Sequence, residues 1–293
     1  MNSLLSPDFW DREWANFRSL NVSNTSKHAS QSEYWNGRAE DFARSTIHSA
    51  SKSSRIDKVF NYLRSFGILQ PGIKVLDIGS GPGSFAIPLA ALGYDVVAFD
   101  PSPKMLEILR ANIPPDLSGN ITTVEGLWEE INIYQMGWDD KFDLVFASMC
   151  PGVHDRNALE KMMLCSKAWC YLSAFSGSRK FTIYDEILNK LFNRKYSNHF
   201  NDVIFPFNLL YALRFQPSIT FWNNSTQHPQ ELGQVKSEIH DIISSISPVN
   251  PEMEAVIDEV MAKHSVNGKV QQQITSAVGM IVWHKKAAGT KPD

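Results

Sequence analysis

The chain reads Val-Leu-Asp-Ile-Gly-Ser-Gly-Pro-Gly-Ser at residues 75–84, and this stretch decides the fold. A short apolar run that meets glycines at alternate positions predicts a buried strand followed by a tight turn and a helix. Glycine lets the backbone turn sharply and approach a ligand that a Cβ atom would hold away. The amino end of the next helix presents free N–H groups and a partial positive charge. We therefore expect this turn to bind an anionic group.

From Pro71 onward, short strand patterns alternate with helical ones, which is typical of a parallel α/β sheet. The expected strands cover residues 73–78, 95–99, 121–124, 142–147, 169–175, 218–222 and 277–283. More residues have helical periodicity than a minimal fold of this kind needs, in an insertion near residues 185–215 and again near 228–264. We predict an N-terminal helical cap over residues 1–50 and one α/β domain over residues 51–293.

The composition is that of an ordinary globular protein, with 43% hydrophobic and 20% charged residues among 293. A net charge of −3, without a stripe rich in Lys or Arg, argues against a nucleic-acid partner. Residues 1–14 carry acidic side chains where a secretory signal needs an apolar run, and no apolar run approaches the roughly 20 residues of a membrane span. The three cysteines are an odd number, which favours reduced thiols. We therefore expect a cytoplasmic protein without a nucleic-acid or membrane partner.

Two acidic residues stand at positions that indicate the ligand. Asp100 ends the second strand, seventeen residues after Gly83, where a carboxylate can accept hydrogen bonds from both hydroxyls of a ribose. Asp77 lies two residues before Gly79, where a carboxylate suits a ligand with an amino group. S-Adenosylmethionine has a ribose, an amino group and a carboxylate, and it is the ligand that we predict.

A nicotinamide dinucleotide is the competing ligand, because a glycine-rich turn alone is a weak signal. The dinucleotide pattern requires glycine at the position of Ser84, and dehydrogenases keep the position of Asp77 apolar. A turn without function is the remaining alternative, and it would leave the spacing of Asp77 and Asp100 to coincidence. Both alternatives fit the residues less well than a methyl donor does.

Three segments, Asp77-x-Gly79-x-Gly81-x-Gly83, Asp100 and Phe142-Asp143-Leu144-Val145, resemble the successive motifs of class I S-adenosylmethionine-dependent methyltransferases, over roughly residues 55–176. The resemblance implies a doubly wound, Rossmann-like, mostly parallel sheet of seven strands whose last strand is antiparallel. The donor would lie across the carboxyl ends of strands one, two and four, with its methionine end at Asp77 and Gly79 and its ribose at Asp100. The cofactor-binding residues expected in all are Asp77, Gly79, Ser80, Gly81, Gly83, Asp100, Pro101, Leu127, Trp128 and Ser148.

The adenine contact departs from the pattern of this family. Many members have an acidic residue directly after the glycine that matches Gly126, whereas this chain has Leu127. The resemblance places the adenine edge at Leu127 and Trp128, through backbone groups or through stacking on the indole. Glu129 is the alternative partner.

Methyl transfer from a sulfonium is an in-line displacement, for which an enzyme supplies alignment, a dry site and, for some acceptors, a base. His154, in the loop after the fourth strand, is the candidate base with Asp155 to orient it; the alternative is that Asp155 caps a helix and His154 is an ordinary loop residue. Tyr34, with Trp35, is the candidate to cover the donor as a lid; the alternative is the plain packing of a capping helix. We expect a pocket of roughly a few hundred cubic ångströms for a small-molecule acceptor.

Two further functions stay open. Cys150, Cys165 and Cys170 could capture a metalloid such as arsenite, although no Cys-x-x-Cys spacing exists and small buried thiols are the usual role. A catalytically silent regulator that binds S-adenosylmethionine would share the same donor motif. The sequence predicts no metal site.

Overall fold

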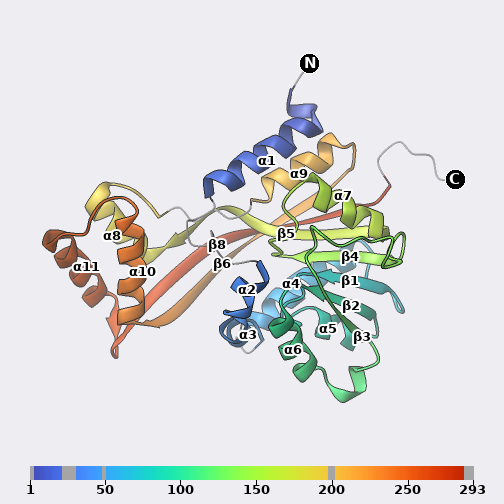
Figure 1. Ribbon diagram of the computed structural model, residues 1–293, viewed down its shortest axis with the longest axis horizontal. Coiled ribbons are helices and arrows are strands. Elements are labelled where there is room, and N and C mark those ends of the chain that lie inside the picture. The colour runs from blue at the N-terminus through green and yellow to red at the C-terminus, as the bar shows by residue number, and fades with distance from the viewer. Residues whose placement is uncertain (1–2, 22–30, 48–50, 197–201, 287–293) are drawn as a thin grey trace. The chain divides into compact units, whose positions relative to one another are not determined.

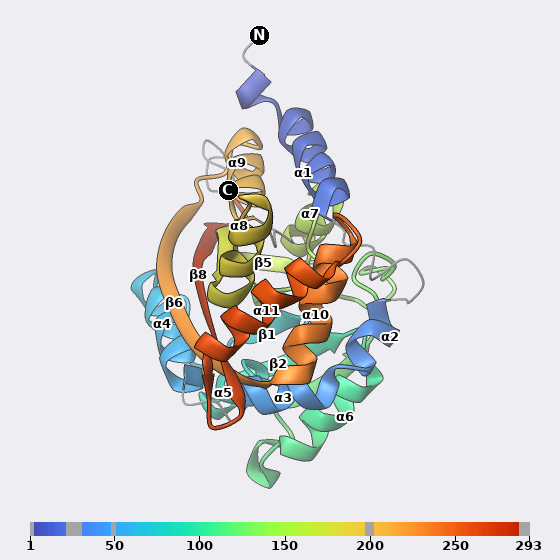
Figure 2. The ribbon, with the colours of Figure 1, turned by 90° about the vertical axis from the view of Figure 1, so that its left-hand side faces the viewer.

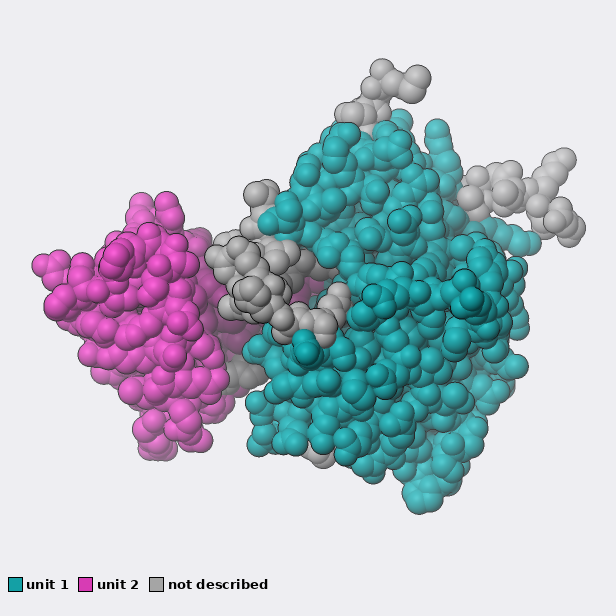
Figure 3. Space-filling model, viewed as in Figure 1, with its two compact units in different colours: residues 1–174, 200–220, 279–293 teal, residues 175–199, 221–278 magenta. Residues whose placement is uncertain are grey.

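The computed structural model describes residues 3–21, 31–47, 51–196 and 202–286 (Figure 1). The chain divides into two compact units, which Figure 3 colours separately. Unit 1 comprises residues 1–174, 200–220 and 279–293, and unit 2 comprises residues 175–199 and 221–278. Within the described ranges, no helix combines the length and the apolar character needed to cross a bilayer.

The sheet has the strand order β3-β2-β1-β4-β5-β8-β6, and a two-residue strand β7 pairs with β8. Its strands are β1 (Lys74–Ile78), β2 (Asp95–Asp100), β3 (Ile121–Glu125), β4 (Phe142–Ser148), β5 (Ser166–Phe181), β6 (Ser218–Glu231), β7 (Ser265–Val266) and β8 (Lys269–His284). The neighbours from β3 to β5 are all parallel.

Strand β8 runs against β5. The N–H of Lys285, directly after β8, donates to the carbonyl of Ala168 near the start of β5. At the other end, the hydroxyl of Thr182, directly after β5, donates to the carbonyl of Gln273 near the start of β8. Because the start of each strand lies beside the end of the other, the two are antiparallel, which confirms the predicted fold class.

Helices cover both faces of the sheet in unit 1, as a doubly wound fold requires. They are α1 (Pro7–Asn21), α2 (Gln31–Asn36), α3 (Ala39–Ile47), α4 (Ser51–Ser65), α5 (Ala86–Ala91), α6 (Pro103–Asn112), α7 (Arg156–Cys165) and α9 (Ile204–Ala212). Side chains alternate along β4, so Val145 packs in the core shared with α7 and α9, whereas Phe146 contacts Phe85 beside α5.

The predicted cap over residues 1–50 is two separate pieces. Helix α1 packs beside α7 and α9, where Trp14 is fully buried and the Asp11 carboxylate accepts from the backbone N–H of Arg156. Helices α2 and α3 lie beside α6 instead, as Figures 1 and 2 both show. Of the described helices of this cap, α2 and α3 are therefore the ones that approach the carboxyl ends of β1 and β2.

Unit 2 has a hydrophobic core of its own. Helices α8 (Thr182–Phe192), α10 (Leu232–Ser244) and α11 (Pro251–Lys263) bury apolar side chains against one another, with Ile187, Ile239 and Ile257 fully buried. The predicted insertion over residues 185–215 is divided differently by the structure. Helix α8 belongs to unit 2, whereas α9 belongs to unit 1, because its Leu209 and Leu210 are buried in the core of that unit.

Candidate functional site

The glycine turn joins the end of β1 to α5 through three residues in the left-handed region, Gly79, Gly81 and Gly83, with φ values of 70°, 55° and 89°. The N–H groups of Gly79 and Ser80 donate to the carbonyl of Phe99 over 2.8 and 3.1 Å, which ties the turn to β2. A Cβ atom on Gly79 would lie 2.6 Å from the Sγ atom of Cys150. Glycine at position 79 is therefore needed for the approach of the loop after β4 as well as for the turn.

Asp100 connects the glycine turn to the start of α6. One carboxylate oxygen accepts from the N–H of Gly81 over 2.8 Å, and the other accepts from the N–H of Ser102 over 2.9 Å. Burial raises the pKa of Asp100, and these two N–H groups act in the opposite direction. Each oxygen keeps a second lone pair, so the carboxylate can shape the turn and still accept from a ligand.

Asp77 is a buried carboxylate whose bonding is incomplete. Its side chain is 2% exposed, and burial, followed by the charge of Asp100, raises its pKa to about 7 against the opposing effects of Arg55 and the Ala86 N–H. Its Oδ2 atom has no hydrogen-bond partner among the described residues, and the same holds for the hydroxyls of Ser80 and Ser84. Buried polar atoms are normally paired, so three unpaired ones on one turn fit a ligand that both donates and accepts hydrogen bonds.

Arg55 is a member of this site that the sequence reasoning missed. It projects from α4, donates to the Ser148 hydroxyl over 3.0 Å and lies over the ring of Phe85 at 5.0 Å. Burial lowers its pKa, opposed by Tyr171 and Asp77. The available signal was a basic residue one helical turn before the buried Val59, on a face that would otherwise be apolar.

Helices α2 and α3 cover the glycine turn. The Cε1 atom of Phe42 lies 3.7 Å from where a Cβ atom of Gly81 would be. The Asn36 side-chain oxygen accepts from the hydroxyl of Ser102 over 2.6 Å and from the N–H of Lys104 over 3.3 Å. Because Ser102 also caps α6, these contacts join α2 to the residues directly after Asp100.

Tyr34 lies further out than the predicted lid required. Its side chain is exposed, its hydroxyl accepts from Arg38 over 3.1 Å, and its ring meets Trp35 edge to face. Trp35 in turn meets Phe42 edge to face. Phe42 and Asn36, rather than Tyr34, are thus the α2–α3 side chains with contacts to the glycine turn and to α6.

The predicted adenine residues differ in accessibility. Trp128 is buried, its indole N–H donates to the carbonyl of Ala158 over 3.1 Å, and its ring meets Phe99 edge to face. Leu127 and Pro101 are only partly buried. Because the indole of Trp128 is buried in the core, it is poorly placed to stack on an adenine ring. The backbone of Leu127 is the better candidate for the adenine contact, through hydrogen bonds.

His154 is held by groups of its own loop and by Glu129, whose carboxylate lies 3.5 Å from the Nδ1 atom of His154. Its Nδ1 atom lies 2.9 Å from the carbonyl of Pro151, and its Nε2 atom lies 3.6 Å from the Asp155 carboxylate. Asp155 caps α7 by accepting from the N–H of Ala158 over 2.7 Å. This arrangement matches the alternative of a helix cap and a loop histidine.

The three thiols do not form one cluster. Cys150 lies against Gly79, whereas Cys165 and Cys170 are buried in the core with α7. Burial raises the pKa of each thiol to about 12, so all three are protonated at neutral pH. The described residues contain no group of three side chains suited to a metal ion.

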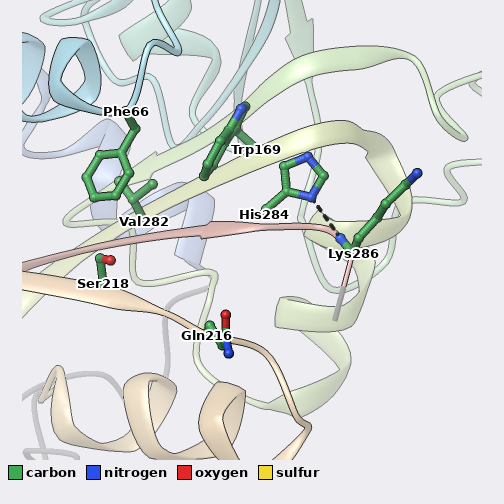
Figure 4. Close-up of a pocket in the computed structure, with 7 residues that line it drawn as sticks. All are labelled: Phe66, Trp169, Gln216, Ser218, Val282, His284 and Lys286. Atoms are coloured by element: carbon green, nitrogen blue, oxygen red, sulfur yellow. Dashed lines mark hydrogen bonds between the residues drawn. The ribbon is translucent and has the colours of Figure 1, made fainter. Parts of the chain in front are cut away.

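A surface cavity of about 220 Å³ lies at the ends of the strands opposite to the glycine turn (Figure 4). Its wall includes Trp169 near the start of β5 and His284 at the end of β8, and its remaining lining residues are Phe66, Gln216, Ser218, Val282 and Lys286. The glycine turn instead follows the carboxyl end of β1. This cavity is therefore separate from the candidate site.

Comparison with known proteins connects the sheet core to one domain family. A family model described as a methyltransferase domain matches residues 75–168. A Haemophilus influenzae protein of uncharacterized function is 40% identical over 97 residues, which are 32% of this chain and 33% of the relative. The magnesium-protoporphyrin O-methyltransferase of Rhodobacter capsulatus is 41% identical over 51 residues, or 17% of this chain and 23% of that one. The chain thus matches a third or less of the length of these curated relatives.

The solved structures that this chain is similar to are distant from it in sequence. A magnesium protoporphyrin IX methyltransferase from Synechocystis with bound S-adenosylhomocysteine is 14% identical, with a TM-score of 0.43 over 94% of this chain and 96% of that one. A S-adenosylmethionine-dependent methyltransferase from Aquifex aeolicus is 12% identical, with a TM-score of 0.47 over 82% and 95%.

Proposed function

We propose that this chain is a class I S-adenosylmethionine-dependent methyltransferase and that it transfers a methyl group from that donor to a small-molecule acceptor. The match of its residues 75–168 to a methyltransferase domain supports the proposal. The observation that carries the proposal is the glycine turn with its unpaired polar atoms on Asp77, Ser80 and Ser84. Asp100 lies directly beside them, bonded to the same turn. A zwitterionic nucleoside offers the ammonium, carboxylate and hydroxyl groups that such atoms can bind.

The chain's own residues would divide the binding as follows. Asp77 accepts from the ammonium group, and the free lone pairs of Asp100 accept from the ribose hydroxyls. The backbone of Gly79 and the hydroxyl of Ser80 complete the methionine end, and the backbone of Leu127 contacts the adenine edge. When bound, the donor would supply the methyl group of its sulfonium to an acceptor that attacks the methyl carbon in line, and S-adenosylhomocysteine would leave as the thioether.

The contacts of the described residues favour catalysis by alignment of the donor and exclusion of water over catalysis by a general base. Phe42 already lies over the glycine turn, so α2 and α3 can keep water from the transfer. His154 would have to leave its loop contacts to serve as a base, and Tyr34 would have to move inward to touch an acceptor. Cys150 alone lies at the turn, so the proposal does not extend to a metalloid acceptor. The free thiols fit a cytoplasmic location.

Calorimetry with S-adenosylhomocysteine, the demethylated donor, tests the proposal. The unaltered chain should bind it in the micromolar range with a raised Tm, because a ligand of the native state stabilises that state. Asp100→Ala removes the proposed ribose acceptor and should weaken binding at least about tenfold. Asp95→Ala, an exposed carboxylate at the start of the same strand, is the matched control. A folded protein that does not bind S-adenosylhomocysteine and binds NADH instead would overturn the proposal.

A further inference from the structure

The cavity of Figure 4 has an apolar part that is formed mainly by aromatic rings. Phe66 directly follows α4, and the centroid of its ring lies 6.0 Å from that of Trp169, at an interplanar angle of 55°. Val282 of β8 is buried and lines the cavity with them. Two tilted rings and an aliphatic side chain form a surface that can pack against a flat apolar group.

Another part of the cavity lining is polar, and none of it is acidic. Gln216, which precedes β6, and Ser218, the first residue of β6, lie below Phe66 in the view of Figure 4. Neither side chain has a hydrogen-bond partner among the described residues. Both present N–H or O–H donors. An anionic group in this cavity would therefore meet hydrogen-bond donors and no carboxylate.

His284 and Lys286 complete the polar part. The backbone N–H of Lys286 donates to Nδ1 of His284 over 3.1 Å, the contact dashed in Figure 4. Burial, followed by the charge of Lys286, lowers the pKa of His284, so its ring is neutral at pH 7 and carries its proton on Nε2. The ammonium group of Lys286 extends away from the other lining residues in Figure 4, and it has no ion-pair partner among the described residues. Lys286 thus brings an unpaired positive charge to the edge of the cavity.

The size and place of the cavity restrict what it can hold. An apolar cavity of about 150 Å³ holds a benzene molecule, so about 220 Å³ accommodates one ring with a small substituent. Trp169 lies four residues before Ser173, which is paired with Ser148 at the carboxyl end of β4. At about 3.3 Å per residue, this separation is about 13 Å. A molecule in the cavity is therefore too far from the carboxyl ends of the strands to receive a methyl group in line.

We propose that this cavity binds a single-ring aromatic carboxylate that is neither the methyl donor nor the methyl acceptor. The ring of the ligand lies against Phe66 and Trp169, and its carboxylate faces the donors of Gln216 and Ser218. The exposed ammonium group of Lys286 attracts the carboxylate through the solvent and can reach it by rotation of its long side chain. The proposal is independent of the proposed function, because the two sites lie at opposite ends of the strands.

A gap in the packing that holds only water is the competing explanation. Such a gap would not distinguish a charged solute from a neutral one of the same shape. A carboxylate site predicts a preference for the anion, and it predicts that this preference depends on Lys286.

The test measures the binding of benzoate and of its neutral counterpart benzamide by NMR. The indole N–H signal of Trp169, identified with Trp169→Phe, reports binding in the cavity. Lys286→Met removes the unpaired charge at an exposed position, so the fold is retained. Lys58→Met, at an exposed lysine of α4, is the matched control. Ser218→Leu fills the cavity from its polar part.

We expect benzoate to shift the Trp169 signal with a Kd of about 1 mM or below, which is modest for a molecule of this size. Lys286→Met should weaken benzoate binding about threefold, as the loss of an exposed charge pair does, and should leave benzamide binding unchanged. Lys58→Met should change neither affinity, and Ser218→Leu should abolish both. Saturation with S-adenosylhomocysteine should leave the affinity for benzoate unchanged.

Three results would overturn the proposal. They are an unshifted Trp169 signal at about 10 mM benzoate, equal affinities for benzoate and benzamide, and displacement of benzoate by S-adenosylhomocysteine, which would place benzoate in the donor site. A chain that binds benzoate as expected but does not bind S-adenosylhomocysteine would instead remove the proposed function and leave the assignment of this cavity intact.

Discussion

Replacing Asp77 with Asn should stabilise the free protein while weakening the donor site. Each pKa unit corresponds to about 1.4 kcal/mol, so raising the Asp77 pKa from its ordinary 3.8 to about 7 costs the folded state about 4 kcal/mol above pH 7. The sign follows from proton binding: between these two pKa values the folded state holds a proton that the unfolded state has lost. The free energy of unfolding therefore falls as the pH rises from about 4 to about 7.

The amide introduced by Asp77→Asn has the shape of the carboxylate without its charge, so the gain should depend on pH. We expect an increase in unfolding free energy of up to about 4 kcal/mol at pH 8 and less than half of that at pH 5. Urea unfolding followed by tryptophan fluorescence measures this, because seven of the eight tryptophans lie in unit 1. Asp95→Asn, at an exposed position, should stay within about 0.5 kcal/mol at both pH values. A destabilised Asp77→Asn protein at pH 8, or the same gain at both pH values, would refute this reasoning.

Two further predictions concern the glycine turn and its cover. Gly79→Ala should destabilise by more than about 2 kcal/mol, since φ is 70° and the new Cβ atom would lie 2.6 Å from Sγ of Cys150. The double variant Gly79→Ala/Cys150→Ala should recover much of the steric cost, because it removes Sγ and leaves the Cβ atom of residue 150 at 3.1 Å. Gly72→Ala, with φ of 76° and open space, should show only the backbone cost, and no recovery in the urea midpoint of the double variant would contradict this. Amide hydrogen exchange over residues 31–36 and 39–47 should slow when S-adenosylhomocysteine binds, whereas residues 7–21 should not change, because α1 packs on α7 and α9. Equal protection with and without ligand would reduce α2 and α3 to ordinary packing.

The sequence predicted the sheet best where strands are short and apolar. The expected strands from β1 to β4 agree with the structure to within about one residue at each end. The expected last strand began at Ala277, whereas β8 begins at Lys269. The part that was missed contains Gln272, a buried polar residue whose side-chain oxygen accepts from the N–H of Ile183 at the start of α8. A polar side chain that satisfies another element's backbone breaks the alternation on which strand prediction depends.

The cover of the site was harder to predict, because the expectation of a helical cap over residues 1–50 did not locate the break between its helices. The structure ends α2 at Asn36 and begins α3 at Ala39, with a turn at Gly37 between them. A break of this kind resets the helical phase, so the face that Tyr34 occupies does not continue to Phe42. The Asn36-Gly37 pair was the local signal for that break. Arg55 was missed for a different reason, since nothing in a local motif connects a helix before β1 with the end of β4.

Asp77 and Gly79 represent two kinds of residue in the site, which should respond differently to substitution. Where a side chain is buried and incompletely bonded, as at Asp77, neutralising it should make the free protein more stable and donor binding weaker. Where a residue is needed for close packing, as at Gly79, substitution should lower both stability and affinity. Asp100 belongs to an intermediate kind, because it supports the turn through Gly81 and Ser102 and also faces the proposed ribose position. Measuring stability and donor affinity together for variants of these three residues therefore shows which residues contribute free energy of donor binding and which only maintain the shape of the site.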